Sequence, residues 1–266
     1  MTKYPFPKCD LHLHLDGSML PETAWELAIE RGIKLPADTL EAFRSFIVVT
    51  ADCRSVNEYL ERFAMPLSIL QDKASLERVT YELICLLAKQ GLAYAEIRFA
   101  PQLHMQKGLT QRDAVDAVLA GRARAMAECP SIDTNIILCT MSQIPAGLND
   151  KENLETVRVA KEYLGKGVVA VDLAGCEGIV PLKTFHPIFD LAKELDIPFT
   201  CHAGDSQGPD TVLDALDFGT KRIGHGHHIF NDKTLCARAI RDGVTLEVCP
   251  TVTSSARPSP PTRSIR

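Results

Sequence analysis

Short apolar runs alternate with amphipathic stretches along most of the chain. The runs are rich in β-branched residues, which is typical of buried strands, and the stretches between them place apolar residues at helical spacing. The predicted strands are the stretch around His12 and residues 94–100, 135–140, 168–173, 197–202, 222–225 and 244–249. The predicted helices are 22–31, 74–90, 110–128, 150–165, 184–195, 209–217 and 231–243, the last capped by Asn231. This alternation predicts an α/β fold with a parallel sheet and crossover helices.

The first predicted strand alternates polar and apolar residues from Asp10 to Gly17. Because side chains on a strand alternate between its two faces, His12 and His14 share one face, about 6.6 Å apart. Two imidazoles at that spacing can reach one metal ion. The plain alternative is a half-buried strand whose histidines contact only water, and the pair by itself favours that alternative.

The interval between the first two strands, about residues 20–90, is much the longest and is a candidate helical lid. Ser55 to Glu58 has the form of a capping box, and four apolar residues follow one helical face: Val56, Tyr59, Leu60 and Phe63. We expect this face to pack on the domain rather than to cover a ligand pocket. Residues 1–251 form the predicted domain, and 252–266, rich in Ser, Pro, Thr and Arg without periodicity, form a predicted disordered tail.

Composition sets broad limits on function. With 266 residues, 45% hydrophobic and 24% charged, the chain can form one globular domain. The net charge of -5 argues against nucleic acid or an anionic membrane as partner, and no apolar run approaches the roughly 18 residues that span a bilayer. The N-terminus lacks the apolar segment of a signal peptide. Nine cysteines without a Cys-x-x-Cys pair predict reduced thiols in the cytoplasm.

Four of the eight histidines lie at the carboxyl ends of predicted parallel strands, where barrel enzymes place their active sites. His12 and His14 end the first strand, His202 ends the fifth and His225 ends the sixth. This clustering shifts the balance toward a metal site. Imidazole ligands with an oxygen donor suit zinc, and a catalytic zinc keeps one position open for water.

Two further positions carry candidate chemistry. Asp205, three residues after His202, is equally well explained as a general acid or base and as an ordinary carboxylate that caps the next helix or lies in the loop before it. Gly175 ends the fourth strand, where it would let a backbone N–H approach a planar ligand, although an ordinary turn is the favoured interpretation. The sequence contains neither Gly-x-x-x-x-Gly-Lys-[Ser/Thr] nor Gly-x-Ser-x-Gly, so phosphate-loop and serine-hydrolase interpretations fail.

The chain closely resembles the adenosine deaminases of the zinc amidohydrolase superfamily over about residues 6–251. The shared motifs occur in the family's order: His12-Leu-His-Leu-Asp-Gly17, Ala95-Glu-Ile-Arg-Phe-Ala-Pro101, Val171-Asp-Leu-Ala-Gly175, Cys201-His-Ala-Gly-Asp205, Arg222-Ile-Gly-His-Gly226 and Glu247-Val-Cys-Pro-Thr251. The resemblance implies a TIM (β/α)8-type barrel, with about seven of the eight strands present. It also implies hydrolytic deamination of adenosine and deoxyadenosine to inosine and ammonia, in purine salvage.

The resemblance implies a role for each candidate residue. The implied ligands of the Zn2+ cofactor are His12, His14 and His202. A water that the zinc activates would attack C6 of the purine, with assistance from His225. The implied substrate contacts are His14, Asp16 at the ribose 5′-hydroxyl and the Gly175 backbone at purine N3. Asp16 favours the nucleoside over the free base, because adenine deaminases usually carry Glu at this place.

Two departures from the family pattern stand out. Asp205 stands where the family usually has a Glu that donates a proton to purine N1; its reach is about 1 Å shorter, enough to cost on the order of a hundredfold unless the loop adjusts. The family also continues past Cys-Pro-Thr to an eighth strand with a further zinc ligand, in Asn-Thr-Asp-Asp-Pro, which this sequence lacks.

The tail offers an explanation for the missing strand. With a suitable choice of codons, a DNA sequence that encodes residues 253–266 also encodes LQCKTVASYEEHP in a reading frame shifted by one base. This peptide is what a member of the family would be expected to carry after Cys-Pro-Thr-Ser. We therefore expect that a single-base deletion near codon 252 truncated the chain. Such a barrel would leave its first and seventh strands with unpaired edges, fold poorly and be weakly active at best.

Alternative functions stay open at this point. One is deamination of adenine or of a modified nucleoside. The other is an inactive fragment that binds purine without turnover. The expected partner is a small purine nucleoside, and the sequence does not indicate an oligomeric state.

Overall fold

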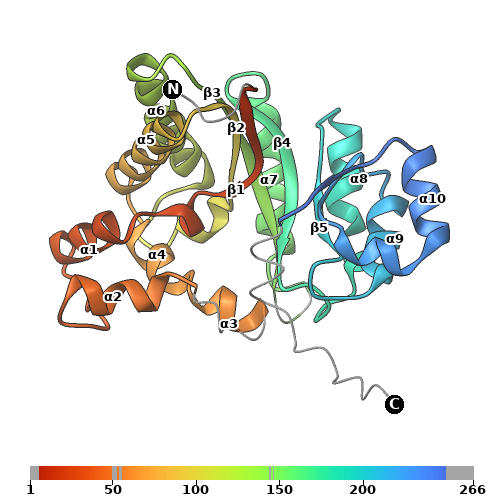
Figure 1. The fold of residues 1–266 in the computed structure, drawn as a ribbon, viewed down its shortest axis with the longest axis horizontal. Coiled ribbons are helices and arrows are strands. Elements are labelled where there is room, and N and C mark those ends of the chain that lie inside the picture. The colour runs from red at the N-terminus through yellow and green to blue at the C-terminus, as the bar shows by residue number, and fades with distance from the viewer. Residues whose placement is uncertain (1–5, 50–52, 54–55, 144, 146, 250–266) are drawn as a thin grey trace.

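The computed structural model describes residues 6–49, 53, 56–143, 145 and 147–249. Within those ranges the chain alternates strands and helices, as the hydrophobic pattern predicts (Figure 1). No helix of this described part has both the length and the apolar character needed to cross a membrane. The predicted tail, 252–266, and the proposed cap Ser55 lie outside the described residues.

The strands run parallel and follow one another in chain order. The first sheet contains β1 (Lys8–His14), β2 (Leu92–Phe99), β3 (Asp133–Ser142) and β4 (Val168–Gly175). The second contains β5 (Cys201–Ala203), β6 (Arg222–His225) and β7 (Thr245–Glu247). Val171 joins the two sheets, because its N–H donates to Pro198 at 3.0 Å and its carbonyl accepts from Thr200 at 2.9 Å. The predicted α/β parallel fold is confirmed, as seven strands of a partial TIM barrel.

Helices surround these strands. They are α1 (Pro21–Glu30), α2 (Leu40–Ile47), α3 (Val56–Glu61), α4 (Ala64–Ile69), α5 (Lys73–Lys89), α6 (Gln111–Glu128), α7 (Asp150–Tyr163), α8 (His186–Glu194), α9 (Pro209–Asp217) and α10 (Lys233–Arg241). Figure 1 shows α1 to α6 on the side of β1 to β3, and α8 to α10 gathered beside β5. Asp232, and not Asn231, caps α10, because its carboxylate accepts from the N–H groups of Thr234 and Leu235.

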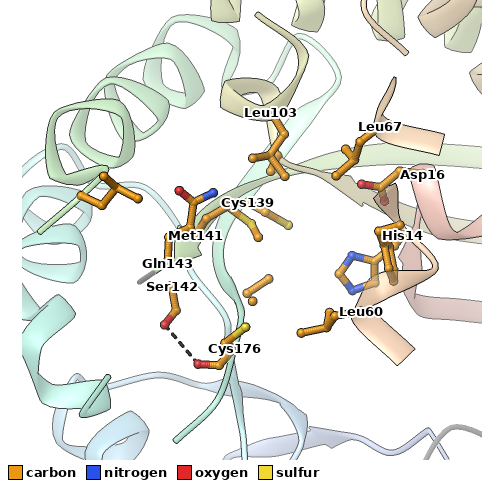
Figure 2. A pocket seen from close by; sticks show the side chains of 15 residues that line it. His14, Asp16, Leu60, Leu67, Leu103, Cys139, Met141, Ser142, Gln143 and Cys176 are labelled. Carbon is orange, nitrogen blue, oxygen red and sulfur yellow. Dashed lines mark hydrogen bonds between the residues drawn. The ribbon is translucent and has the colours of Figure 1, made fainter. Parts of the chain in front are cut away.

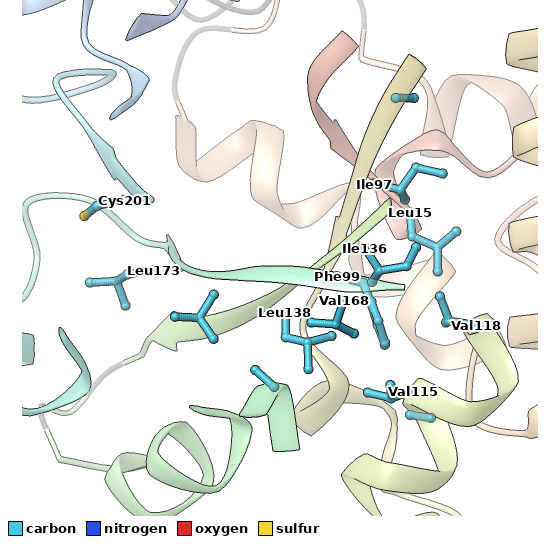
Figure 3. Packing of buried hydrophobic residues seen from close by; sticks show 14 of the residues in the cluster. Leu15, Ile97, Phe99, Val115, Val118, Ile136, Leu138, Val168, Leu173 and Cys201 are labelled. Carbon is cyan, nitrogen blue, oxygen red and sulfur yellow. The ribbon is translucent and has the colours of Figure 1, made fainter. Parts of the chain in front are cut away.

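The main hydrophobic core lies between the first sheet and the helices that cover it. Ile97 and Phe99 of β2 and Ile136 of β3 are almost completely buried and pack with Val115 and Val118 of α6 (Figure 3). Burial of such side chains stabilises a fold by about 1.5–3 kcal/mol each. This packing fixes the strands, and with them the positions of the residues at their carboxyl ends.

The two outer strands of the arrangement are β1 and β7. Within the described part of the chain, neither pairs with a further strand on its outer side. Side chains connect them instead: the Nδ1 atom of His12 on β1 lies 2.9 Å from a carboxylate oxygen of Glu247 on β7.

Candidate active site

Four histidines converge at the carboxyl ends of β1, β5 and β6. The ring centroid of His12 lies 4.6 Å from that of His202 and 4.6 Å from that of His225. His14 lies 5.2 Å from His202 by the same measure. The strands are parallel, so their carboxyl ends meet at one end of the barrel. Residues from positions far apart in the sequence therefore form one cluster, as the sequence predicts.

The cluster offers nitrogen donors at distances suited to one metal ion. One ring nitrogen each of His12, His202 and His225 lies within 4.8 Å of the others. The Nε2 atoms of His14 and His202 are 3.2 Å apart, close to the edge of about 3.3 Å expected between two ligands of a tetrahedral Zn2+ with bonds of 2.0–2.1 Å. The donor set therefore fits a metal ion, and His202 belongs to both groupings.

The charge state of these imidazoles also suits metal binding. Burial, reinforced by the positive charge of Arg98 and by the neighbouring histidines, lowers the pKa of His12 well below its usual value. Burial likewise lowers the pKa of His14, and lowers that of His225 to about 2. These rings are neutral at pH 7, and the neutral imidazole is the form that binds a metal.

Two buried carboxylates orient the rings from behind. A carboxylate oxygen of Asp172, on β4, lies 3.0 Å from Nδ1 of His202, and Glu247 lies 2.9 Å from Nδ1 of His12. Each Nδ1–H donates to its carboxylate, which leaves the Nε2 atom of that ring for the cluster. Metal-binding histidines characteristically have such a carboxylate partner, which fixes the tautomer and the ring orientation.

Arg98, on β2, connects these two carboxylates. It is fully buried, 3.1 Å from Asp172 and 2.7 Å from Glu247, and it also donates to the Leu11 carbonyl at 2.7 Å. Burial acts to raise the pKa of Asp172, but the charges of His202 and Arg98 hold that pKa well below its usual range. Asp172 is therefore a charged acceptor at neutral pH.

The sequence reasoning did not assign these roles to Arg98, Asp172 and Glu247, although all three lie within the quoted motifs. The signal that would have found them is a charged residue inside an apolar strand. Arg98 stands between Ile97 and Phe99, and such a residue needs buried partners of opposite charge. The partners of Arg98 come from neighbouring strands, so they cannot be identified from the spacing of residues in the sequence.

Asp205 follows β5 and lies beside the histidines. Its Oδ1 atom is 3.5 Å from Nδ1 of His225, and its side chain is only 14% exposed. Burial, and then the negative charge of Glu177, raises the pKa of Asp205 above its usual value. The α9 helix has Gly208 at its N-cap, without a side-chain cap, so Asp205 does not cap that helix. Its carboxylate lies in the loop before α9.

Asp16 and Gly175 complete the set of predicted positions. Asp16 begins a one-turn 3-10 helix after β1 and is 6% exposed, and burial raises its pKa to about 6. Gly175 ends β4 with a φ of +110°, and a Cβ atom there would lie 2.6 Å from the Ser142 carbonyl oxygen. Only glycine fits this backbone position, and both the turn and the ligand-contact interpretations are compatible with it.

Two adjoining cavities bring these residues together. The smaller, about 230 Å³, is lined by the four histidines and Asp205. The larger, about 400 Å³, is mostly apolar, with His14 and Asp16 on one wall and Met141 and Cys176 opposite (Figure 2). Both are lined by His14, Leu60, Phe63, Ala174 and Gly175. A planar ligand in the larger cavity therefore reaches the histidine cluster at its end.

The helical insert contributes to these walls. Leu60 and Phe63 line both cavities, and Tyr59 lines the smaller one. The ring centroid of Phe63 is 6.3 Å from that of His14. The expectation that this face packs on the domain rather than over a pocket is therefore wrong: periodicity shows that a helix face is covered, but not whether protein or a cavity covers it.

Comparison with known proteins agrees with this geometry. The family model described as adenosine deaminase matches residues 7–257. A protein of Haemophilus ducreyi named adenosine deaminase is 46% identical over 244 residues, which cover 91% of this chain and 70% of that protein.

Two solved structures share the fold. An adenine deaminase from Arthrobacter aurescens superposes with a TM-score of 0.82 at 24% identity, covering 94% of this chain and 73% of that one. An amidohydrolase from Burkholderia ambifaria, solved with bound Zn, superposes with a TM-score of 0.81 at 22% identity, covering 94% and 66%. With the family model and the Haemophilus relative, the evidence is sufficient to state that the chain belongs to the adenosine deaminase family.

Proposed function

We propose that this chain catalyses the hydrolytic deamination of adenosine, and of deoxyadenosine, to inosine and ammonia with Zn2+ as cofactor. The observation that carries the proposal is the convergence of four histidines and Asp205 on a cavity that opens into a larger apolar one. Family membership supplies the reaction. Purine salvage is the process that such a reaction serves.

The proposed metal ligands are His12, His14 and His202. Their support is the 3.2 Å separation of the His14 and His202 nitrogens and the carboxylate partners of His12 and His202. When bound, Zn2+ lowers the pKa of water and supplies a nucleophile at neutral pH. Two of the imidazoles, those of His12 and His202, are held in the required orientation and tautomer by Arg98, Asp172 and Glu247.

Two residues are placed to handle protons. The Nδ1 atom of His225 is buried and has no hydrogen-bond partner among the described residues, so it can accept a hydrogen bond from the attacking water and assist its activation. Asp205, whose pKa is raised by burial, can carry a proton and deliver it to N1 of the purine. Protonation of the ring makes C6 more electrophilic, which is general acid catalysis.

The larger cavity is the proposed nucleoside site. Its apolar walls suit the faces of a purine, the Gly175 backbone is proposed to donate to N3, and Asp16 is proposed to accept from the ribose 5′-hydroxyl. The insert of residues 20–90 is the proposed lid, because Leu60 and Phe63 lie on the cavity walls. The nine cysteines are scattered singly along the sequence without a Cys-x-x-Cys pair, which favours a reducing compartment, and the cytoplasm is the proposed location.

Asp16 provides the test that separates nucleoside from free base. We expect the zinc-loaded chain to convert adenosine to inosine, and Asp16→Asn to lower kcat/KM for adenosine by about 10- to 100-fold, the cost of weakening one charged hydrogen bond. Adenine lacks the ribose, so the substitution should leave any adenine turnover unchanged. Faster turnover of adenine than of adenosine would identify an adenine deaminase and contradict the proposal.

A further inference from the structure

Glu177 occupies the loop that follows β4 and makes an unusual number of hydrogen bonds to one segment. The segment is residues 204–211, between β5 and α9, and it carries Asp205. Oε1 accepts from the Gly204 N–H at 2.6 Å and the Thr211 hydroxyl at 2.6 Å. Oε2 accepts from the N–H groups of Asp205 at 3.0 Å, Ser206 at 2.7 Å and Gln207 at 3.3 Å, and from the Ser206 hydroxyl at 3.2 Å.

Beyond Glu177, the segment's Gly204 donates to the Thr211 hydroxyl at 3.0 Å and accepts from the His228 N–H at 3.2 Å. Residues 205–207 form bends rather than a helix or strand, and the four consecutive N–H groups of 204–207 converge on this carboxylate. Consecutive backbone N–H groups form a concave site for an anion, and here the anion is a side chain of the same protein. Charged acceptors make hydrogen bonds about twice as strong as neutral ones.

The two loops also fit closely against each other. Gly178, next to Glu177, has a φ of +83°, and a Cβ atom there would lie 2.3 Å from the Gln207 side chain. On the other side of Glu177, two residues away, Gly175 lines both cavities. Glu177 therefore connects the loop that forms the proposed purine contact to the segment that carries the proposed proton donor.

We propose that Glu177 is a positioning residue that holds segment 204–207 so that the Asp205 carboxyl faces His225 and the substrate. The inference rests on the proposed function, in which Asp205 protonates the purine. It adds a residue from the loop after β4, with no contact to substrate or metal required. A displacement of about 1 Å at a reacting group can lower a rate by about 100-fold, so the chemical step should be sensitive to this carboxylate.

Glu177→Gln tests the inference, because the amide nitrogen of Gln cannot accept a hydrogen bond and one side of the cradle is lost. We expect kcat for adenosine to fall about 10- to 100-fold, with KM changed less than about threefold. Zinc content should stay as in the parent. Ser206→Ala is the matched control, because it removes only the weaker hydroxyl contact at 3.2 Å and should change kcat less than about threefold.

Two readouts separate a positioning role from a general structural one. On an Asp205→Ala background, Glu177→Gln should lower kcat no further, because residues that act through one another are not additive. Amide hydrogen exchange of residues 204–207 should accelerate at least about tenfold in Glu177→Gln, with or without turnover. Unchanged exchange, or the same fractional loss of kcat on the Asp205→Ala background, would overturn the inference. Full activity of Asp205→Ala alone would instead refute the proposed role of Asp205, and the exchange data would still decide whether Glu177 holds the segment.

Discussion

At the scale of single residues, buried charge is the feature that shapes this site. Arg98 has no exposed surface and lies between two carboxylates, each of which contacts a histidine of the cluster. Removal of one member of a buried ionic group leaves the others desolvated and unpaired. The network therefore couples the stability of the barrel to the orientation of the proposed metal ligands.

Arg98→Met tests this coupling. We expect the free energy of unfolding to fall by about 3–5 kcal/mol, because Asp172 and Glu247 lose their buried counter-charge. Arg112→Met is the control, since Arg112 pairs with Glu162 at the surface with a side chain that is 46% exposed, and it should cost at most about 1 kcal/mol. Chemical denaturation of both variants gives the comparison. Equal decreases in the free energy of unfolding would show that Arg98 has no special role in stability.

His104 makes stability depend on pH. The residue is fully buried, its Nδ1 lies 2.7 Å from the Leu70 carbonyl oxygen, and burial lowers its pKa from 6.5 to about 4. Below pH 6.5 the unfolded chain gains a proton that the native state does not, so stability falls as pH drops from 6.5 to 4. The loss from this group approaches about 3 kcal/mol.

Denaturation curves across this pH range check the His104 prediction. His104→Gln keeps a donor for the Leu70 carbonyl but does not titrate, so its stability should fall less steeply between pH 6.5 and 4 than that of the parent chain. The other buried histidines contribute some pH dependence of stability in both proteins. If stability fell equally steeply with pH in His104→Gln and in the parent chain, His104 would not be responsible for that dependence.

At the scale of elements, hydrophobic pattern and end signals predicted most of the structure. The bounds of β6 and α9 agree residue for residue with the predicted 222–225 and 209–217. β5 was predicted to begin at Ile197 but begins at Cys201. Pro198 explains the difference, because it has no N–H to donate to a neighbouring strand.

The α3 helix and the turn after it show what pattern alone could not predict. Tyr59, Leu60 and Phe63 repeat at helical spacing, yet they line the cavities. The distinction depends on where the insert folds back, which is a property of tertiary structure. Aromatic and aliphatic side chains at such a position are available to contact a planar ligand.

Phe63→Ala tests the contribution of this insert. We expect KM for adenosine to rise about 10-fold with kcat changed less than threefold, because the lost aromatic wall contributes about 1 kcal/mol or more to binding the purine. Phe46→Ala is the matched control: Phe46 lies on α2, is 45% exposed and does not line either cavity. Steady-state kinetics of both variants give the comparison. Equal KM values for Phe63→Ala and Phe46→Ala would refute a role for the insert in substrate binding.

At the scale of the whole molecule, the site depends on nearly every strand. His12 and His14 come from β1, Arg98 from β2, Asp172 from β4, His202 from β5, His225 from β6 and Glu247 from β7. The sequence predicted that the histidines would cluster, because they lie at the ends of predicted strands that alternate regularly with helices. It could not predict the partners of Arg98, or Glu177 as the acceptor for segment 204–207, because those contacts arise only when the strands and loops assemble.

The proposed function requires this assembly to hold one zinc ion and to use it in the deamination of adenosine. The most direct measurement is titration of the metal-free chain with Zn2+, following both bound zinc and the appearance of inosine with ammonia. We predict that activity rises with zinc to a plateau at about one ion per chain, and that His202→Ala abolishes both the tight binding and the activity. Purine binding without turnover in the fully zinc-loaded chain would contradict the claim.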